Sequence, residues 1–222
     1  MSRTAWVCAG VLSWVTIAGV RAVDLPAMEE TLKVVPKKAE AKKSIMALKE
    51  PVELPFYVFN NAIFPPVRNF AGTGFMGDVN DITMVGSYTE LHQKEYPSLK
   101  IIYAAMDYAG WAGVFWQNPA NNWGEVDGRY NLSKAKKLSF WARGEKGGEV
   151  IVAFQAGGIL QRYPDSDVRA LRKVTLTGAW KQYTIDLTGA DFRFLSGGFS
   201  FFVRRVDNPE GCSFYLDDIK YE

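Results

Sequence analysis

The chain has 222 residues, and its 26 Lys and Arg against 24 Asp and Glu leave a formal net charge of only +2. This near balance gives no reason to expect a nucleic-acid or anionic-membrane partner, because such partners usually require a strongly basic surface. Hydrophobic residues make up 48% of the sequence, and the length suffices for the core of one domain of ~170 residues.

The N-terminal segment has the layout of a secretory signal peptide. Arg3 precedes a mostly apolar run over residues 5–20, and the small residue Ala22 follows. We expect cleavage after Ala22 and exclude residues 1–22 from the fold. The alternative is an uncut anchor, which needs ~20 apolar residues, but this run contains Ser13 and ends at Arg21. We therefore expect an exported protein, periplasmic or secreted, with no stable membrane span after cleavage.

Cysteine usage limits how the fold is stabilised. Cys8 lies in the expected signal peptide, so Cys212 is the only cysteine of the mature sequence. A single cysteine cannot form an intramolecular disulfide. The domain must therefore depend on packing, with or without a metal.

Residues 23–54 are expected to form a linker or tether. They contain the basic block PKKAEAKK, prolines at Pro26 and Pro36, and no aromatic residue, and their basic and acidic residues nearly balance. This composition is typical of a solvated linker. The alternatives are a basic patch that grips a cell-envelope polymer and a contact with an envelope protein partner.

From residue 55 onward, short apolar runs alternate with clusters of Gly, Asn, Asp and Pro. The runs are PFYVFN, LKIIYAAM, AGVFWQ, KLSFWARG, EVIVAFQAGG, KVTLT, KQYTIDL, GGFSFFVRR and CSFYLDDIKYE. No amphipathic helix and no repeat interrupts them. This spacing predicts that residues 55–222 form an all-β domain, an antiparallel sandwich or barrel.

Side-chain alternation gives four of these runs two faces. One face is wholly apolar and is expected to form the core: Ala112, Val114 and Trp116; Leu138, Phe140 and Ala142; Val150, Val152 and Phe154; Phe199, Phe201 and Val203. The other face is mixed and carries Gln117, Trp141, Arg143, Gln155 and Arg204 beside the rings of Phe115 and Phe202.

The mixed face has two interpretations. A solvated face would not usually keep several large rings beside arginines and amides. A shallow groove for a sugar would, since pyranose C–H patches stack on aromatic faces while hydroxyls bond to Arg and Gln. The alternative is that a loop or the N-terminal tail covers this face.

Several motifs in order resemble a known family. They are GFMGDVNDI, GWAGVFWQNPANNWG, KLSFWARGEKGGEVI, a YPDSD loop, WKQYTIDLTG and CSFYLDDIKYE. Over residues 56–222 the chain resembles the carbohydrate-binding-module type of jelly roll within the galactose-binding-like sandwiches. It is most similar to exported bacterial domains of uncharacterised function, and more distantly to the family 11 glucan-binding modules.

The resemblance implies a two-sheet jelly roll of eight or more strands that holds a saccharide on its concave face or rim loops. It also implies a structural calcium near the junction of the first and last strands, with Asp217 as a ligand. Calcium takes six to eight oxygen ligands. The first strand offers Asn60 and Asn61, where relatives often have an acid. The alternative is that Asp217 and Asp218 end an exposed edge strand and cap a turn.

The stretch GWAGVFWQNPANNWG combines a strand with a turn-rich loop. Alternation assigns Trp116 to the core. We expect Trp123 to be a stacking platform, with Asn118, Asn121 and Asn122 as hydroxyl partners or loop braces. The alternative is that Trp111 and Trp123 plug the ends of the sandwich.

The loop GGILQRYPDSDVRA combines Tyr163 and Asp165 with nearby arginines. Aromatic and acidic groups together on a polar loop fit the rim of a sugar site. Gly157 and Gly158 permit close backbone approach just before it. The alternative is a solvated crossover whose Asp-Ser-Asp makes local turns.

The sequence offers little for catalysis. His92 is the only histidine, and neither zinc spacing nor a nucleophile elbow is present. Acid pairs two residues apart, such as Glu125 and Asp127, arise by chance. We therefore expect no catalytic residues and a non-catalytic glycan-binding module; the alternative is a structural or interaction protein of the envelope, and a β-sandwich hydrolase or lyase has less support.

Overall fold

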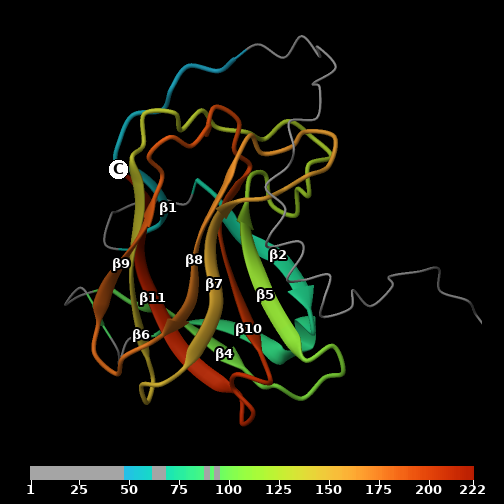
Figure 1. Cartoon of the computed structure of the whole chain (residues 1–222), viewed down its shortest axis with the longest axis vertical. Helices are drawn as coiled ribbons and strands as arrows, with labels where there is room; N and C mark the ends of the chain where they lie inside the picture. The colour runs from blue at the N-terminus through green and yellow to red at the C-terminus, as the bar shows by residue number, and fades with distance from the viewer. Residues whose placement is uncertain (1–47, 62–68, 88–90, 93–95) are drawn as a thin grey trace, which may run out of the picture. The chain divides into compact units, whose positions relative to one another are not determined.

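The computed structural model describes residues 48–61, 69–87, 91–92 and 96–222. Our expectations for residues 1–22 and for most of the tether lie outside the described residues. The described chain is almost entirely β-structure (Figure 1). Its elements are β1 (Phe56–Phe59), β2 (Ala71–Gly77), the 3-10 helix η1 (Val79–Asp81), β3 (Ile82–Ser87), β4 (Ser98–Tyr103), β5 (Trp111–Gln117), β6 (Lys137–Gly144), β7 (Val150–Gly157), β8 (Val168–Thr175), β9 (Lys181–Asp186), β10 (Gly197–Arg204) and β11 (Cys212–Tyr221).

The strands form two antiparallel sheets, which confirms the predicted two-sheet jelly-roll sandwich. We name each sheet after its central strand. The β10 sheet has the order β2-β5-β10-β7-β8, and the β11 sheet has the order β3-β4-β11-β6-β9, with β1 also paired to β11. Because neighbours in each sheet come from distant parts of the sequence, most of the pairing is long-range.

Strand β11 ties the β11 sheet together. On one side it pairs with β6, and on the other with β4 along its first half and β1 along its second. The hydroxyl of Tyr221 donates a hydrogen bond of 2.6 Å to the carbonyl of Gly198 in the opposite sheet. The last strand is therefore held by both layers.

The core lies between the two sheets, where inward side chains of both layers interlock. Phe140 of β6 contacts Phe154 of β7 and Phe199 of β10, with ring centroids 4.7 and 5.2 Å apart. All three rings are fully buried. Burying a ring of this size stabilises the fold by about 1.5–3 kcal/mol, so the aromatic runs that predicted strands also provide the packing.

Strand β7 departs from the predicted alternation. Ile151, assigned to the outward face, is fully buried in the core, whereas Val150 and Val152 are only half buried. In the partner strand, Lys173 lies opposite this point with a left-handed φ of 49°. Such a residue interrupts the pleat, so the core assignment of Val150 and Val152 is wrong although that of Phe154 is confirmed.

The last residues of the expected tether contact the sandwich. Pro51 forms an isolated bridge with Asn131, and the Val52 amide donates to the Asn131 carbonyl at 2.9 Å. Val52 and Leu54 pack against the core. Within the described residues, no helix is long and apolar enough to cross a membrane.

Candidate functional site

The predicted mixed face is not one surface. Trp141 and Arg143 lie on β6 in the β11 sheet, whereas Gln117, Gln155 and Arg204 lie on strands of the β10 sheet. Alternation shows which residues point away from the core, but a sandwich has two outward faces on opposite sides. The prediction that these five residues share one face is therefore wrong, and each outward face has to be considered by itself.

The outward face of the β10 sheet carries a row of four aromatic rings, which we call the four-ring row. Trp111 lies 6.5 Å from Phe202, Phe202 lies 6.4 Å from Phe115, and Phe115 lies 6.0 Å from Trp123, measured between ring centroids. The last two contacts are edge-to-face, an arrangement that aromatic pairs prefer. The row thus continues from the strands onto the loop after β5.

The inner rings of this row are covered. Phe115 and Phe202 are only 4% and 7% exposed, while the two terminal tryptophans are half buried. A Cβ at Gly197 would lie 3.0 Å from the Phe115 ring and 3.3 Å from Cδ1 of Ile159. The loop that carries Ile159 therefore covers part of this face, as one of the two interpretations of the sequence predicts.

Polar groups without partners lie beside the rings. Gln117 and Ser200 are fully buried, and neither the Gln117 amide nor the Ser200 hydroxyl has a hydrogen-bond partner in the described structure. By contrast, Gln155 donates to the Gly157 carbonyl at 2.9 Å. A Cβ at Gly74 would come within 2.7 Å of the Gln117 amide, so this glycine makes room for it. Buried polar groups are nearly always paired. Six described residues have buried side-chain atoms without a partner, and Gln117 and Ser200 are the two on this face; the others are His92, Tyr103, Glu149 and Tyr183.

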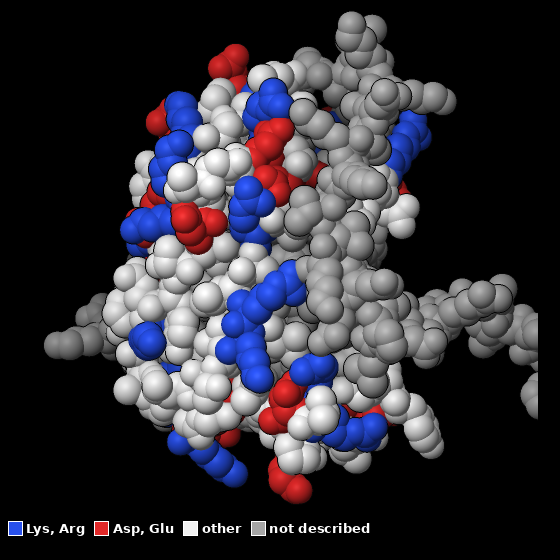
Figure 2. Space-filling model, in the orientation of Figure 1, with Lys and Arg blue, Asp and Glu red and all other residues white. Residues whose placement is uncertain are grey.

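Charges of both signs gather at the two ends of the visible surface (Figure 2). In Figure 2, Lys and Arg are mixed with Asp and Glu at both ends of the molecule, and the surface between them is mostly uncharged apart from a short basic band. Arg204 forms an ion pair with Asp207 at 2.7 Å. The predicted arginine is thus partly neutralised.

Asp165 has a different position from the rim ligand that the sequence predicts. Its side chain is 6% exposed and accepts hydrogen bonds from the backbone N–H groups of Ile159, Ser196 and Gly197, at 3.0, 2.6 and 3.3 Å. The Ser196 hydroxyl donates a fourth, at 3.1 Å. Burial raises the pKa of Asp165, and these donors oppose the rise. The carboxylate braces the loop after β7 against β10.

Tyr163 lies in the same loop but is half buried. Its backbone amide donates to the Gly124 carbonyl at 2.9 Å, which ties it to the loop of Trp123. The guanidinium groups of Arg129 and Arg162 lie 5.5 and 5.4 Å from its ring. The structure therefore brings together two predicted rim residues, Tyr163 and Trp123.

Two of the predicted asparagines brace the Trp123 loop. Asn118 donates to the Gly128 carbonyl, while Asn122 donates to two carbonyls and accepts from the Gly124 amide. Asn121 is exposed with a left-handed φ of 59°, which asparagine tolerates. The side chains of Asn118 and Asn122 are thus used locally.

The outward face of the β11 sheet holds a second aromatic cluster. His92 stacks on Trp141 at 4.2 Å and lies 5.3 Å from Trp180. Trp180 makes an edge contact with Tyr215. Lys100 and Arg143 each lie 5.4 Å from the Tyr215 ring, which lies between them. Sequence reasoning missed Trp180, although the run WKQYTIDL places it directly before β9, the strand that pairs with β6. No sequence pattern pointed to His92 as a member of this cluster.

Two ionisable groups of this cluster have shifted pKa values. Burial lowers the pKa of His92, with Asp218 opposing the shift. Burial raises the pKa of Asp217 to about 6. His92 Nδ1 lies 3.5 Å from Asp217 Oδ2, so the two groups face each other in a poorly solvated place.

The residues implied as calcium ligands do not fit a calcium ion. Asn60 contacts Asp218 as a donor, from Nδ2 to Oδ1 at 2.7 Å. The Lys220 ammonium binds the other Asp218 oxygen at 2.9 Å, where it supplies the positive charge. Calcium requires several oxygen acceptors around one point, and the described residues contain no cluster of three metal-binding side chains.

Three acidic loop residues, Asp127, Asp165 and Asp167, are engaged in local bonds. Asp127 accepts from Arg129 Nε at 3.0 Å, and Asp167 from Arg169 at 2.7 Å. Asp165 holds the four donors described above. A general acid and base need a shared opening onto a substrate, and these residues point into separate local networks.

Comparison with solved structures places the fold. A family 30 carbohydrate-binding module superposes with a TM-score of 0.53 at 16% identity, covering 77% of this chain and 99% of the module. A family 11 module of a Clostridium thermocellum cellulosomal cellulase gives 0.44 at 16% identity, covering 68% of this chain and 83% of the module.

The fold is a carbohydrate-binding-module-type β-sandwich. At these identities the likeness concerns the fold alone. No protein-family model and no curated protein matches the sequence. The resemblance noted from the sequence motifs is confirmed at the level of architecture.

Proposed function

We propose that this protein is a non-catalytic glycan-binding protein whose site lies on the outward face of the β10 sheet and the adjoining rim loop. One observation carries the proposal: the four-ring row lies beside the Gln117 amide, which has no described partner. As the sequence suggests, we further propose that the chain is exported.

The chemistry of this face suits a neutral, hydroxyl-rich ligand. Sugar C–H patches stack on aromatic rings, and an amide offers a donor and an acceptor to neighbouring hydroxyls. A buried polar group left unpaired costs about 1–3 kcal/mol. Gln117 and Ser200 are fully buried, so hydroxyls would pair with them, and remove this cost, only where the loop that carries Ile159 moves aside.

The terminal rings have the leading role in this proposal. Trp111 and Trp123 are half buried and offer ring surface, whereas Phe115 and Phe202 support them from below. Tyr163 extends the rim beside Trp123. The fold likeness to a module named for carbohydrate binding agrees with this use of the sandwich.

The test is affinity electrophoresis of the purified protein through gels that contain soluble polysaccharides, followed by calorimetry on any that retain it. Trp123→Ala should weaken binding at least about tenfold, the usual cost of truncating an aromatic anchor. Trp141→Ala, a matched tryptophan on the opposite sheet, should bind like the wild type. Retention by no polysaccharide would overturn the function, and a loss in Trp141→Ala alone would overturn the location.

A second function is favoured by a specific observation. The near-complete burial of Phe115 and Phe202 also suits a protein that keeps the sandwich as a structural or interaction module of the envelope. The same experiment separates the two, because this alternative predicts no retention by any polysaccharide and equal behaviour of both tryptophan variants.

A further inference from the structure

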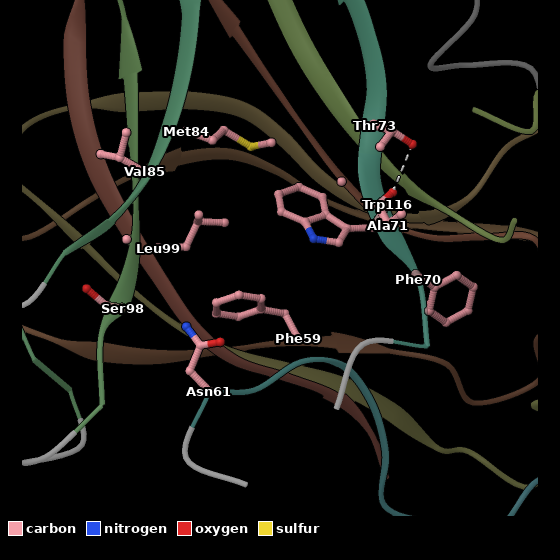
Figure 3. A pocket seen from close by; sticks show the side chains of 12 residues that line it. Phe59, Asn61, Phe70, Ala71, Thr73, Met84, Val85, Ser98, Leu99 and Trp116 are labelled. Atoms are coloured by element: carbon pink, nitrogen blue, oxygen red, sulfur yellow. Dashed lines mark hydrogen bonds between the residues drawn. The ribbon is translucent and has the colours of Figure 1, made fainter. Parts of the chain in front are cut away.

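A cavity opens at the edge of the sandwich, away from the four-ring row. It has a volume of about 460 Å³ and lies between β2, the edge strand of the β10 sheet, and β3, the edge strand of the β11 sheet (Figure 3). Its lining includes Phe59, Phe70, Met84, Leu99 and Trp116, with Asn61, Thr73 and Ser98 as the polar side chains. Pockets of 300–1,000 Å³ typically hold small molecules.

The walls of this edge cavity are largely apolar. Figure 3 shows Phe59, Leu99 and Met84 around the indole of Trp116, whose nitrogen faces the open space. Within the described chain, this N–H donates no hydrogen bond, so its proton is available to an acceptor in the cavity. Trp116 is otherwise a core residue that packs edge-on against Phe199, so one edge of the indole belongs to the core and the other to the cavity.

Glycine at position 72 keeps the cavity open. A Cβ there would lie 3.0 Å from Cε2 and 3.1 Å from Nε1 of Trp116. On the opposite wall, a Cβ at Gly86 would meet only Pro97, at 3.8 Å. Substitution at Gly72 therefore obstructs the indole, whereas substitution at Gly86 leaves it accessible.

The polar groups of the cavity are too few for a sugar. The Asn61 amide donates to the Pro97 carbonyl at 2.9 Å, and the Thr73 hydroxyl to the Ala71 carbonyl at 3.5 Å. A pyranose brings several hydroxyls, and each one buried without a partner is unfavourable. A ring with one oxygen acceptor has to satisfy only the indole N–H.

We propose that this edge cavity binds a small single-ring aromatic molecule that carries one carbonyl or hydroxyl oxygen. The ring lies among Phe59, Leu99 and Met84, and the oxygen accepts a hydrogen bond from Trp116 Nε1. This site is separate from the proposed glycan surface, because it is reached from between the sheets and not from the outward face of one of them.

Acetophenone and toluene are the probes, since they differ by the carbonyl acceptor. The ¹H–¹⁵N spectrum of the full chain contains indole signals from its seven tryptophans, and the signal lost in Trp116→Phe identifies Trp116. Acetophenone should shift this signal and bind roughly three- to tenfold more tightly than toluene, the effect of one net hydrogen bond. Glucose should leave it unmoved.

Two matched glycine variants test the location. Gly72→Val should weaken acetophenone binding at least tenfold, and Gly86→Ala should keep it within twofold; both should retain the wild-type far-ultraviolet circular dichroism. If Gly72→Val does not fold, Leu99→Trp obstructs the cavity from the opposite sheet and should give the same loss.

An unmoved Trp116 signal with both probes, binding unchanged in the obstructing variant, or competition by glucose would each overturn the proposal. Equal affinity for the two probes would overturn the role of the indole N–H. None of these outcomes depends on retention by a polysaccharide, so the two proposals succeed or fail separately.

Discussion

The outward faces of the two sheets have similar residue types but different internal bonding. On the β11 sheet, Lys100 binds Glu145 at 2.6 Å, and Glu145 also accepts from the Tyr215 hydroxyl. On the β10 sheet, Gln117 and Ser200 have no described partners beside the four-ring row. On the β11 face, His92 Nδ1 also has no hydrogen-bond partner, but it lies 3.5 Å from Asp217 Oδ2. The comparison teaches that aromatic and polar residues together do not define a binding surface: what matters is whether the polar groups are already satisfied.

The largest expected effect comes from the buried carboxylate that holds the loop over the β10 face. Asp165→Ala leaves four donors without their acceptor and should lower the free energy of unfolding by about 3 kcal/mol, measured by urea denaturation. Glu145→Gln, which affects an exposed ion pair on the other face, should cost less than about 1 kcal/mol. Equal losses would contradict the contrast between the faces.

The pH dependence of stability should differ through Asp217. Its folded-state pKa of about 6 exceeds the ordinary 3.8, so the folded state binds the proton more tightly than the unfolded state. The stabilisation is fully present below about pH 4 and is lost as the pH rises through 6. Relative to Asp217→Asn, the wild type should lose on the order of 2 kcal/mol between pH 4 and 7.

His92 acts in the opposite direction in this comparison. Because its pKa is lowered in the folded state, His92 stabilises the fold above pH 6.5, and this stabilisation is lost as the pH falls. Urea denaturation of Asp217→Asn and wild type at several pH values compares two proteins that both keep His92, so their difference reports Asp217 together with its effect on the imidazole 3.5 Å away. Parallel stability curves for the two proteins would contradict the shifted carboxyl.

A smaller effect distinguishes the two glutamines of the β10 face. Gln117→Met removes an unpaired amide and should raise the free energy of unfolding by about 1 kcal/mol while weakening glycan binding. Gln155→Met removes a bonded amide and should lower it by a similar amount. Thermal and urea denaturation measure both, and a destabilised Gln117→Met would show that the amide is satisfied in solution.

The smallest expected effect is that of chelation. Because Asn60 donates to Asp218 and Lys220 already neutralises it, EDTA should leave the melting temperature unchanged within about 1 °C. Added calcium should do the same. A melting temperature that rises with calcium and falls with EDTA would instead support the calcium site that the sequence resemblance implies.

Much of the fold followed from local patterns. Runs such as GGFSFFVRR and KLSFWARG predicted strands because aromatic and β-branched residues alternate with turn formers, and their inward residues form the core. The alternation failed in β7, where the left-handed Lys173 of the neighbouring strand shifts which side chains face inward. A single strand carries no information about its partner's backbone.

The site was less accessible to sequence reasoning. Gln117 lies on an outward face, as alternation predicts, but Trp141 and Arg143 were assigned to the same face although they belong to the other sheet. Sheet membership depends on long-range pairing, which no local pattern reports. Asp165 was misread for a related reason, because its donors come from Ser196 and Gly197, about thirty residues away.

The position of β11 has a consequence for how the chain folds. This final strand fills the middle of its sheet, between β6 on one side and β4 and β1 on the other. Until it is synthesised, those strands have no common neighbour, and β1 must wait for a partner at the far end of the sequence. Such distant pairing makes assembly slow. Removal of the whole strand, Cys212–Tyr221, should therefore leave β4 and β6 without a common neighbour and prevent the layer from forming as one sheet.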